Sequence, residues 1–204
     1  MSNQDLDSLK KAAALKAVEF VRDGMVVGLG TGSTAKHMVI ALGEKVRAGM
    51  TLRGVPTSKE TAALARQQGI TLIDTDPAWV IDVAIDGADQ VDPAFNLIKG
   101  GGGALLKEKI VAASAKQFIV LVDQTKRVSV LGGSFPLPIE VLPFGWGSTA
   151  REIEILTKSP VVLRERNGSP FITEAGHVIL DVHIPRIDNP KELELALNQI
   201  PGVV

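Results

Sequence analysis

The stretch Met25-Val26-Val27-Gly28-Leu29-Gly30-Thr31-Gly32-Ser33-Thr34 decides the class of fold. Its apolar first half is typical of a buried strand, and its second half is a glycine-rich turn that opens a helix reaching to about residue 46. Further short apolar runs follow at residues 51–55, 70–73, 80–85 and 118–122, mostly separated by helical segments. Short strands that alternate with helices predict an α/β fold with a mostly parallel sheet covered by helices on both faces.

The pattern changes after about residue 130. A stretch rich in glycine and proline, residues 132–138, leads to strand-like runs at 139–142, 161–166 and 178–183 and to helices near 149–156 and 191–199. The pair Asn167-Gly168 lies between two strand-like runs and predicts a β-hairpin. We therefore predict two domains, an α/β domain over residues 1–130 and a small α+β domain over residues 131–204.

Bulk composition excludes several classes of protein. The chain has 204 residues, a net charge of −1 and no cysteine. A net charge near zero gives no general attraction to nucleic acid or to an anionic membrane, so we expect neither as a partner. The lack of cysteine excludes disulfides and thiolate metal sites. The polar N-terminal residues do not resemble a signal peptide, and we expect a cytoplasmic protein.

The most unusual segment is Lys99-Gly100-Gly101-Gly102-Gly103, followed at Glu108 by an acidic residue one turn into a predicted helix over residues 104–115. Four consecutive glycines lose much conformational entropy when they become ordered, so such a loop suggests that the backbone passes close to a ligand. A cation, exposed backbone amides and a carboxylate together suit a site that stabilises an oxyanion while a proton moves. The simpler interpretation is a solvent-exposed lysine and a helix-surface glutamate.

Two other motifs also follow apolar strands. Asp86-Gly87-Ala88-Asp89 lies at the end of one strand, where it could be only an Asx turn. The loop at residues 28–34 fits a dinucleotide fingerprint poorly because its third glycine is displaced, and it lacks the Gly-Lys-Ser/Thr ending of a P-loop. It could be a tight turn with Ser33 or Thr34 as helix N-cap, which is compatible with binding a phosphate there.

The three motifs, in this order and spacing, resemble the type A ribose-5-phosphate isomerases over nearly the whole chain. The resemblance implies a Rossmann-like catalytic domain, a ferredoxin-like second domain and a homodimer. It implies interconversion of D-ribose 5-phosphate and D-ribulose 5-phosphate through an enediol or enediolate, in the non-oxidative branch of the pentose phosphate pathway. Family members usually continue beyond the equivalent of residues 200–204, so we expect their C-terminal return strand to be absent here.

The resemblance also implies roles for individual residues. Glu108 would be the base, and Lys99 with the amides of Gly100, Gly101 and Gly102 would stabilise the oxyanion. Asp86 and Asp89 would serve ring opening and hydroxyl protons, with their separate duties left open, and Gly87 and Ala88 would contact the substrate. The phosphate would be held by Thr31, Gly32, Ser33, Thr34 and Lys126. No metal and no cofactor is expected, since lysine and amides supply the electrophile.

Two other functions remain for comparison. A sugar-phosphate-binding sensor of the same fold would keep the phosphate loop but would not need Lys99 and Glu108. A nicotinamide-dependent oxidoreductase is disfavoured by the glycine spacing of the first loop. His177 and His183 have no partners at a recognisable metal-ligand spacing and are interpreted as ordinary strand residues.

Overall fold

The computed structural model describes residues 3–73 and 79–204. The chain divides into two compact units, which are described separately. Unit 1 contains Met1–Ala88 and Lys107–Thr125, and unit 2 contains Asp89–Leu106 and Lys126–Val204. The sequence-based boundary at residue 130 had assigned residues 89–106 to the first domain, whereas the structure groups them with the second.

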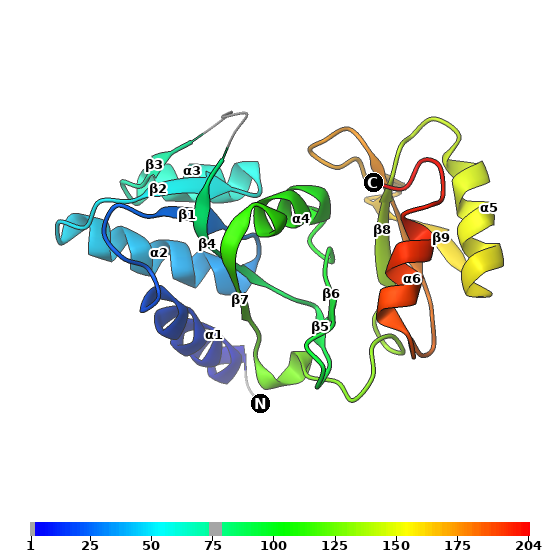
Figure 1. Cartoon of the computed structure of the whole chain (residues 1–204), viewed down its shortest axis with the longest axis horizontal. Helices are drawn as coiled ribbons and strands as arrows, with labels where there is room; N and C mark the ends of the chain where they lie inside the picture. Colours follow the sequence, from blue (N-terminus) through cyan, green and yellow to red (C-terminus); the bar gives the residue numbers. More distant parts are fainter. Residues whose placement is uncertain (1–2, 74–78) are drawn as a thin grey trace. The chain divides into compact units, whose positions relative to one another are not determined.

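The core of unit 1 is a five-stranded parallel sheet (Figure 1). Its strand order is β3-β2-β1-β4-β7, with bounds β1 Val26–Leu29, β2 Arg53–Pro56, β3 Thr71–Leu72, β4 Ile81–Gly87 and β7 Ala115–Leu121. Counted along the chain, this is the order 3-2-1-4-5 of the doubly wound folds, in which ligands bind beyond the carboxyl ends of the strands. The predicted fold class is confirmed.

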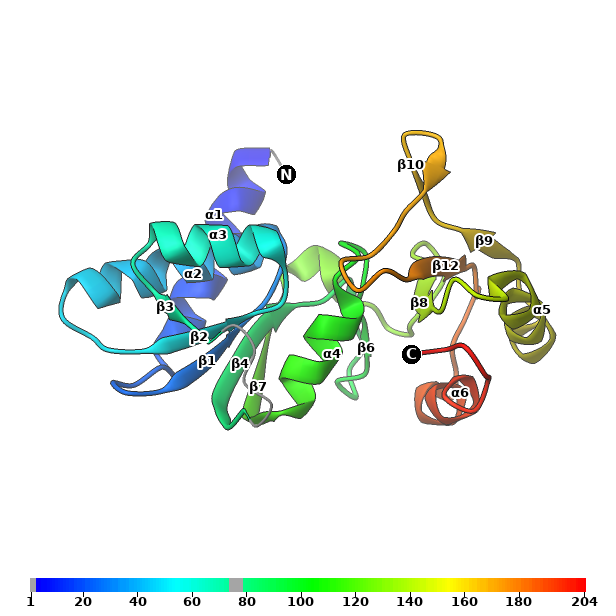
Figure 2. The same ribbon diagram turned by 90° about the horizontal axis from the view of Figure 1, so that it is seen from above.

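Helices cover both faces of this sheet (Figure 2). Helices α1 (Asn3–Val18), α2 (Ser33–Arg47) and α3 (Lys59–Gln67) lie on one face, and α4 (Leu105–Ala113) lies on the other. Successive side chains of a strand point to opposite faces of the sheet, so each face has its own apolar core. Val27 and Ile85 pack with the first group, while Val26 and Ala84 pack with Val111 of α4. Because both faces are buried, β1 and the middle of β4, Val83–Ile85, are apolar throughout.

Strand β7 begins earlier than the sequence predicted. The apolar run suggested a start at residue 118, but β7 begins at Ala115, which pairs with Ile81 of β4. Lys116 and Gln117 are exposed, and Lys116 Nζ donates to Asp82 Oδ1 over 2.7 Å. Hydrogen bonding to β4 therefore extends the strand into residues whose polarity concealed it.

Unit 2 is built on a three-stranded antiparallel sheet in the order β8-β12-β9, with bounds β8 Leu137–Val141, β9 Val161–Leu163 and β12 Val178–Val182. Helices α5 (Trp146–Thr157) and α6 (Pro190–Leu197) belong to the same unit, as do two short hairpins. One hairpin joins β5 (Gln90–Val91) to β6 (Leu97–Ile98). The other joins β10 (Glu165–Arg166) to β11 (Ser169–Pro170). At its turn Asn167 and Gly168 both have positive φ, 56° and 74°, as the predicted Asn-Gly turn requires.

Candidate active site

Asp86 lies at the carboxyl end of β4, where only 4% of its surface is exposed. Its Oδ1 accepts hydrogen bonds from the amides of Thr31 at 3.0 Å and Gly87 at 2.7 Å. The carboxylate therefore joins the end of β4 to the loop that opens α2, which we call loop 30–34. Asp86 is therefore buried, and its hydrogen bond to the remote Thr31 amide shows that it does more than form a local Asx turn.

Glycine is necessary at two positions of loop 30–34 for different reasons. A Cβ on Gly30 would lie 2.1 Å from Asp86 Oδ1, so any side chain there would displace the aspartate. Gly32 has a φ of 111°, which other residues rarely adopt, and it is the N-cap of α2. The prediction that Ser33 or Thr34 caps this helix is wrong, and no side chain caps it.

The start of α2 is consequently open for an anion. The first intrahelical bond of this turn runs from the Lys36 amide to Gly32 O, which leaves the amides of Ser33 and Thr34 without a helical acceptor. The Thr31 amide is different because Asp86 already binds it. Gly32 and Ser33 are exposed. If a phosphate binds here, it is held by the amides after Thr31 rather than by that of Thr31 itself.

A cluster of hydroxyl groups behind loop 30–34 was missed from the sequence. Thr31 Oγ1 lies 2.7 Å from Thr57 Oγ1, and Thr61 Oγ1 donates to Gly30 O at 3.0 Å. Thr57 Oγ1 also donates to Leu29 O, and Ser58 caps α3 by accepting from the Thr61 amide. Thr57 and Ser58 of the β2–α3 turn and Thr61 of α3 are all buried. The available signal was the run of hydroxyl residues that follows β2, in a fold where strand ends carry function.

Glu108 lies in the first turn of α4 and is 6% exposed. The simpler interpretation of a solvent-facing helix glutamate is therefore wrong. Its neighbours in sequence differ, since Lys109 is exposed and Lys107 is half-buried. Burying a carboxylate costs free energy unless hydrogen bonds or an opposite charge compensate it, so a buried glutamate beside a glycine loop is a candidate for a functional acid or base.

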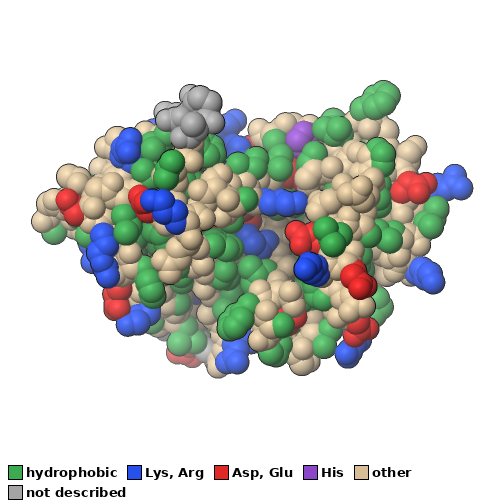
Figure 3. All heavy atoms as spheres, viewed as in Figure 1, with side chains coloured by type: hydrophobic (Ala, Val, Ile, Leu, Met, Phe, Trp, Pro, Cys, Tyr) green, Lys and Arg blue, Asp and Glu red, His purple; other side chains and the backbone are tan. Residues whose placement is uncertain are grey.

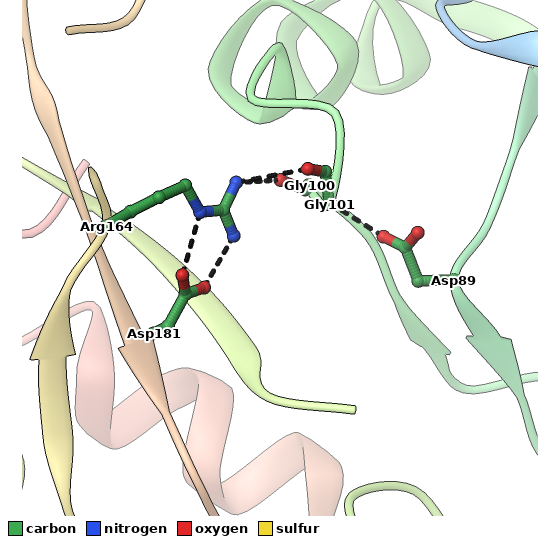
Figure 4. Close-up of polar contacts among 5 residues, drawn as sticks. All are labelled: Asp89, Gly100, Gly101, Arg164 and Asp181. Atoms are coloured by element: carbon green, nitrogen blue, oxygen red, sulfur yellow. Dashed lines mark hydrogen bonds and ion pairs between the residues drawn. The ribbon is translucent and has the colours of Figure 1, made fainter. Parts of the chain in front are cut away.

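The glycine loop, residues 99–103, is held from two sides in unit 2 (Figure 4). On one side the Gly101 amide donates to Asp89 Oδ2 at 2.8 Å. On the other, Arg164 Nη1 donates to Gly100 O at 2.9 Å and to Gly101 O at 3.2 Å. The Asp89 amide also donates to Ile98 O, at the end of β6. Two of the predicted site elements, Asp89 and the glycine loop, are thus brought together.

Packing explains three of the four glycines in this loop. Gly100 and Gly103 have positive φ, and Cβ atoms there would meet Leu105 and the ring of Phe171. A Cβ on Gly101 would lie 2.7 Å from Asp89 Oδ1. Gly102 differs, because its φ is not positive and nothing among the described residues lies within 4 Å of the position that its Cβ would take.

The remaining predicted residues follow strand ends in both units. Lys99 directly follows β6 and is half-buried. Ala88 is half-buried in the chain between β4 and β5. Lys126 ends the short 3₁₀ turn Gln124–Lys126 after β7, and it is half-buried. Asp123 supports that turn by accepting from the Thr125 amide at 2.8 Å.

A buried carboxylate that the sequence analysis overlooked touches the start of α4. Glu140 on β8 is 1% exposed and accepts hydrogen bonds from the Leu106 amide at 3.3 Å and Thr173 Oγ1 at 2.8 Å. His177 Nδ1 lies 3.1 Å from its Oε1. His177 precedes β12, so its interpretation as a strand residue is wrong. A carboxylate at a helix N-terminus interacts favourably with the helix dipole and stabilises the helix.

The predicted site residues thus form two sets. Unit 1 holds loop 30–34, Asp86, Gly87, Ala88 and Glu108, and unit 2 holds Asp89, the glycine loop and Lys126. That the two sets face one substrate stays a prediction. Within residues 3–73 and 79–204, no three His, Asp or Glu side chains are grouped to hold a metal ion.

Charged side chains of both signs are mixed on the surface. Positive and negative side chains are interspersed on the face viewed in Figure 3, without a single-sign patch. In the described part of the chain, every helix is too short or too polar to cross a bilayer.

Comparison with known proteins decides the family. Residues 53–204 match the family model of ribose 5-phosphate isomerase A, also called phosphoriboisomerase A. This chain belongs to the ribose 5-phosphate isomerase A family. The curated ribose-5-phosphate isomerase A of Ruegeria sp. (strain TM1040) is 53% identical over 207 residues, which cover 98% of this chain and 78% of the relative.

Solved structures of isomerases agree with this assignment. Ribose 5-phosphate isomerase A from Methanocaldococcus jannaschii matches with a TM-score of 0.92 and 44% identity, over 100% of this chain and 89% of that one. A D-ribose-5-phosphate isomerase in complex with phospho-erythronic acid matches with a TM-score of 0.92 and 45% identity, over 97% of this chain and 87% of that one. The family predicted from the three motifs is therefore confirmed.

Proposed function

We propose that this protein interconverts D-ribose 5-phosphate and D-ribulose 5-phosphate through an enediolate, by the chemistry that the family name describes. The observation that carries the proposal is the burial of Glu108. This residue lies in the first turn of α4, the helix that follows the glycine loop, in a chain that belongs to an isomerase family. The reaction moves a proton between C1 and C2, so it needs a base, an oxyanion site and a group that serves the hydroxyl protons.

Glu108 is the proposed base. It would remove the proton from one carbon of the open-chain sugar and return it to the adjacent carbon. Its position on a helix, rather than on a mobile loop, supports this role because a base must be held accurately against the carbon that it deprotonates. The burial of Glu108 also keeps bulk water from the transferred proton.

Lys99 and the glycine loop are the proposed oxyanion site. The hydrogen bonds in unit 2 refine this assignment, because Asp89 already accepts from the Gly101 amide. The amide of Gly102 is exposed to a ligand, and no described residue accepts a hydrogen bond from it. We therefore assign the developing negative charge to Lys99 and the Gly102 amide, with Gly101 acting as a support for Asp89.

Asp86 and Asp89 are the proposed groups for ring opening and for the hydroxyl protons. Asp86 Oδ1 is occupied by two backbone amides, and Asp89 Oδ2 by one. Each carboxylate is thus oriented by the backbone, as a proton-transfer group needs. The proposal assigns ring opening to the pair and not to one of the two aspartates. Gly87 and Ala88 lie between them in the sequence and are proposed to contact the substrate.

The phosphate is assigned to the first turn of α2 and to Lys126. The open amides of Ser33 and Thr34 support the first part of this assignment, since helix N-termini bind anions. Lys126 would add a full positive charge. Phosphate binding far from C1 and C2 would orient the reacting carbons against Glu108.

The test is an isomerase assay with ribose 5-phosphate on the wild type and on Glu108→Gln. The amide keeps the size of the side chain but removes the base, so we expect turnover to fall on the order of 10² to 10⁴-fold with little change in KM. Glu60→Gln, an exposed glutamate in the first turn of α3, is the matched control and should retain full activity.

Two outcomes would contradict the proposal. Wild-type protein that binds ribose 5-phosphate without turning it over would favour the non-catalytic sensor, for which the comparisons offer no support. Near-normal turnover by Glu108→Gln would transfer the role of base to another residue. The first outcome is read from a direct binding measurement, such as calorimetry with ribose 5-phosphate, and the second from steady-state kinetics.

A homodimer and a cytoplasmic location also belong to the proposal. Large apolar side chains on and beside α5 are exposed, including Phe144 at 94% and Ile155 at 58%, and they offer a surface for a second copy. A chain without cysteine needs no oxidising compartment for disulfide formation, which is compatible with the proposed cytoplasmic location.

A further inference from the structure

The proposed function does not use Arg164, although this side chain donates hydrogen bonds to two carbonyl groups of the glycine loop. Arg164 follows β9, and its side chain is 15% exposed. Its Nε donates to Asp181 Oδ2 at 2.8 Å, and its Nη2 donates to the other carboxylate oxygen. Its Nη1 reaches the carbonyl oxygens of Gly100 and Gly101 (Figure 4).

The support behind this contact is rigid. The Arg164 amide donates to Ile179 O on β12, and Arg164 O accepts from the Phe171 amide, both at 2.8 Å. Asp181 lies on β12, in the middle of the three-stranded sheet, where it pairs with Val162. A bidentate arginine–carboxylate pair held by a sheet has little freedom to move. The guanidinium is therefore a fixed donor that holds two carbonyl groups of the glycine loop.

The two carbonyl contacts determine where the loop amides point. No cis peptide bond occurs among the described residues, and in a trans peptide the carbonyl of one residue and the amide of the next point in opposite directions. Since Gly100 O points to Arg164, the Gly101 amide points away from it, which is how it reaches Asp89. Since Gly101 O also points to Arg164, the Gly102 amide must point away as well.

The Gly102 amide is thus presented on the opposite side of the loop from Arg164. No described residue accepts a hydrogen bond from it, and no packing requirement explains glycine at this position. A guanidinium bound to the Gly101 carbonyl polarises the same peptide group and makes its amide a stronger donor. Both effects make the Gly102 amide suited to bind an oxygen that carries negative charge.

We propose that Arg164, held by Asp181, is a positioning residue for catalysis that aims the Gly102 amide at the oxygen of the enediolate. This inference rests on the proposed isomerase function. Arg164 acts through the peptide group between Gly101 and Gly102 and does not contact the substrate. Lysine cannot replace it, because a single ammonium group cannot bind the two carboxylate oxygens and the two carbonyl oxygens in this planar arrangement.

The test compares Arg164→Lys, Arg164→Ala and Asp181→Asn with a matched control. Arg186→Ala is that control, since Arg186 also pairs with an aspartate, Asp188, but both side chains are exposed by about two thirds. For the Arg164 variants we expect kcat to fall on the order of 10²-fold, the usual loss when one oxyanion donor is removed, with KM changed less than about threefold. Asp181→Asn should give a smaller loss, and Arg186→Ala none.

Inhibitor affinity separates positioning from a merely structural role. Phospho-erythronic acid has a carboxylate that can occupy the place of the enediolate oxygens, whereas inorganic phosphate occupies only the phosphate site. In the Arg164 variants the inhibition constant of phospho-erythronic acid should rise in proportion to the loss of kcat. The inhibition constant of inorganic phosphate should stay at its wild-type value, and the melting temperature should show that each variant is folded.

Each result decides the proposal. Wild-type kcat in Arg164→Lys overturns it, as does an equal loss of affinity for both inhibitors, which would indicate general damage to the site. If Arg164→Ala does not fold, Arg164→Lys and Asp181→Asn decide by the same criteria. A wild-type protein without isomerase activity would overturn the proposed function, and an active wild type with an unaffected Arg164→Lys would overturn this inference alone.

Discussion

At the scale of single residues, the four consecutive glycines of the glycine loop occupy positions with different physical requirements. Gly100 and Gly103 are required by their positive φ, and Gly101 by the Asp89 carboxylate beside it. Gly102 has neither reason within the described structure. If a close ligand explains the loop, as the sequence suggests, Gly102 is the position where that ligand comes closest.

We therefore predict that Gly102→Ala folds normally and loses activity. Its stability should stay within about 1 kcal/mol of the wild type, because alanine fits this backbone without a clash and restricts the unfolded chain. Its kcat/KM should fall about tenfold or more, since a methyl group would displace the substrate oxygen. Thermal unfolding and steady-state kinetics measure the two effects.

Gly147→Ala is the control for this substitution, since Gly147 is also open and lacks a positive φ but lies in α5. It should leave kinetics unchanged. Full activity in Gly102→Ala would mean that no ligand approaches this residue, and the oxyanion assignment of its amide would then be wrong.

At the scale of the element, the parallel sheet of unit 1 has two ends with different tasks. The carboxyl ends of β1 and β4 carry loop 30–34 and Asp86, which form the candidate site. At the opposite end, Asp82 joins three strands. It accepts from the Val26 amide of β1 at 2.9 Å and from Lys116 Nζ of β7 at 2.7 Å. These bonds lower the pKa of Asp82, the Lys116 bond most strongly.

The pKa of Asp82 predicts a pH-dependent contribution to stability. Because its pKa in the folded protein lies below the ordinary value of 3.8, the ionised carboxylate stabilises the fold fully above pH 3.8. This contribution is lost as the pH falls through the lowered pKa. Asp82→Asn should cost about 1 kcal/mol at pH 7, a modest value because Lys116 is largely exposed.

Urea unfolding at pH 7, 4 and 3 would measure the difference, which should shrink at the lowest pH. Isomerase activity should not change, because Asp82 lies at the end of the sheet away from the candidate site. Asp188→Asn, at an exposed ion pair, is the control. A stability difference that stays constant down to pH 3 would show that the carboxylate charge is not its source.

At the scale of the whole molecule, the proposed mechanism assigns to backbone amides and a lysine the stabilisation of negative charge that a metal ion supplies in some other enzymes. The chain has no cysteine, and its three histidines are His37, His177 and His183. In the described residues no cluster of three acidic or histidine side chains is arranged as a metal site. The proposed oxyanion donors, Lys99 and the Gly102 amide, need no divalent cation.

We therefore predict that isomerase activity is unchanged after dialysis against EDTA. The assay should be run on treated and untreated protein, with and without added Mg²⁺, Mn²⁺ or Zn²⁺. Activity that disappears with EDTA and returns with one of these ions would contradict the assignment of the oxyanion to lysine and amides.

The sequence by itself determined the family, the parallel α/β architecture and the positions of the three motifs. Strong local signals carry this information: apolar runs of strand length, breaker residues between them, and the Asn167-Gly168 turn, whose positive φ values depend on residue type. It also identified Asp86 and Glu108 as unusual, since acidic residues beside glycine-rich loops at strand ends are typical of ligand sites.

The tertiary structure alone decided which groups hold those motifs. Arg164 is separated from Gly100 by 64 positions, and the hydroxyls of Thr57, which follows β2, and Thr61, which lies in α3, are 26 and 30 positions from Thr31. Glu140 reaches the start of α4 from β8. An isolated arginine, threonine or glutamate has no periodicity or spacing that predicts its partner. Its hydrogen bonds depend on distance in space, which arises only when the sheets bring remote segments together.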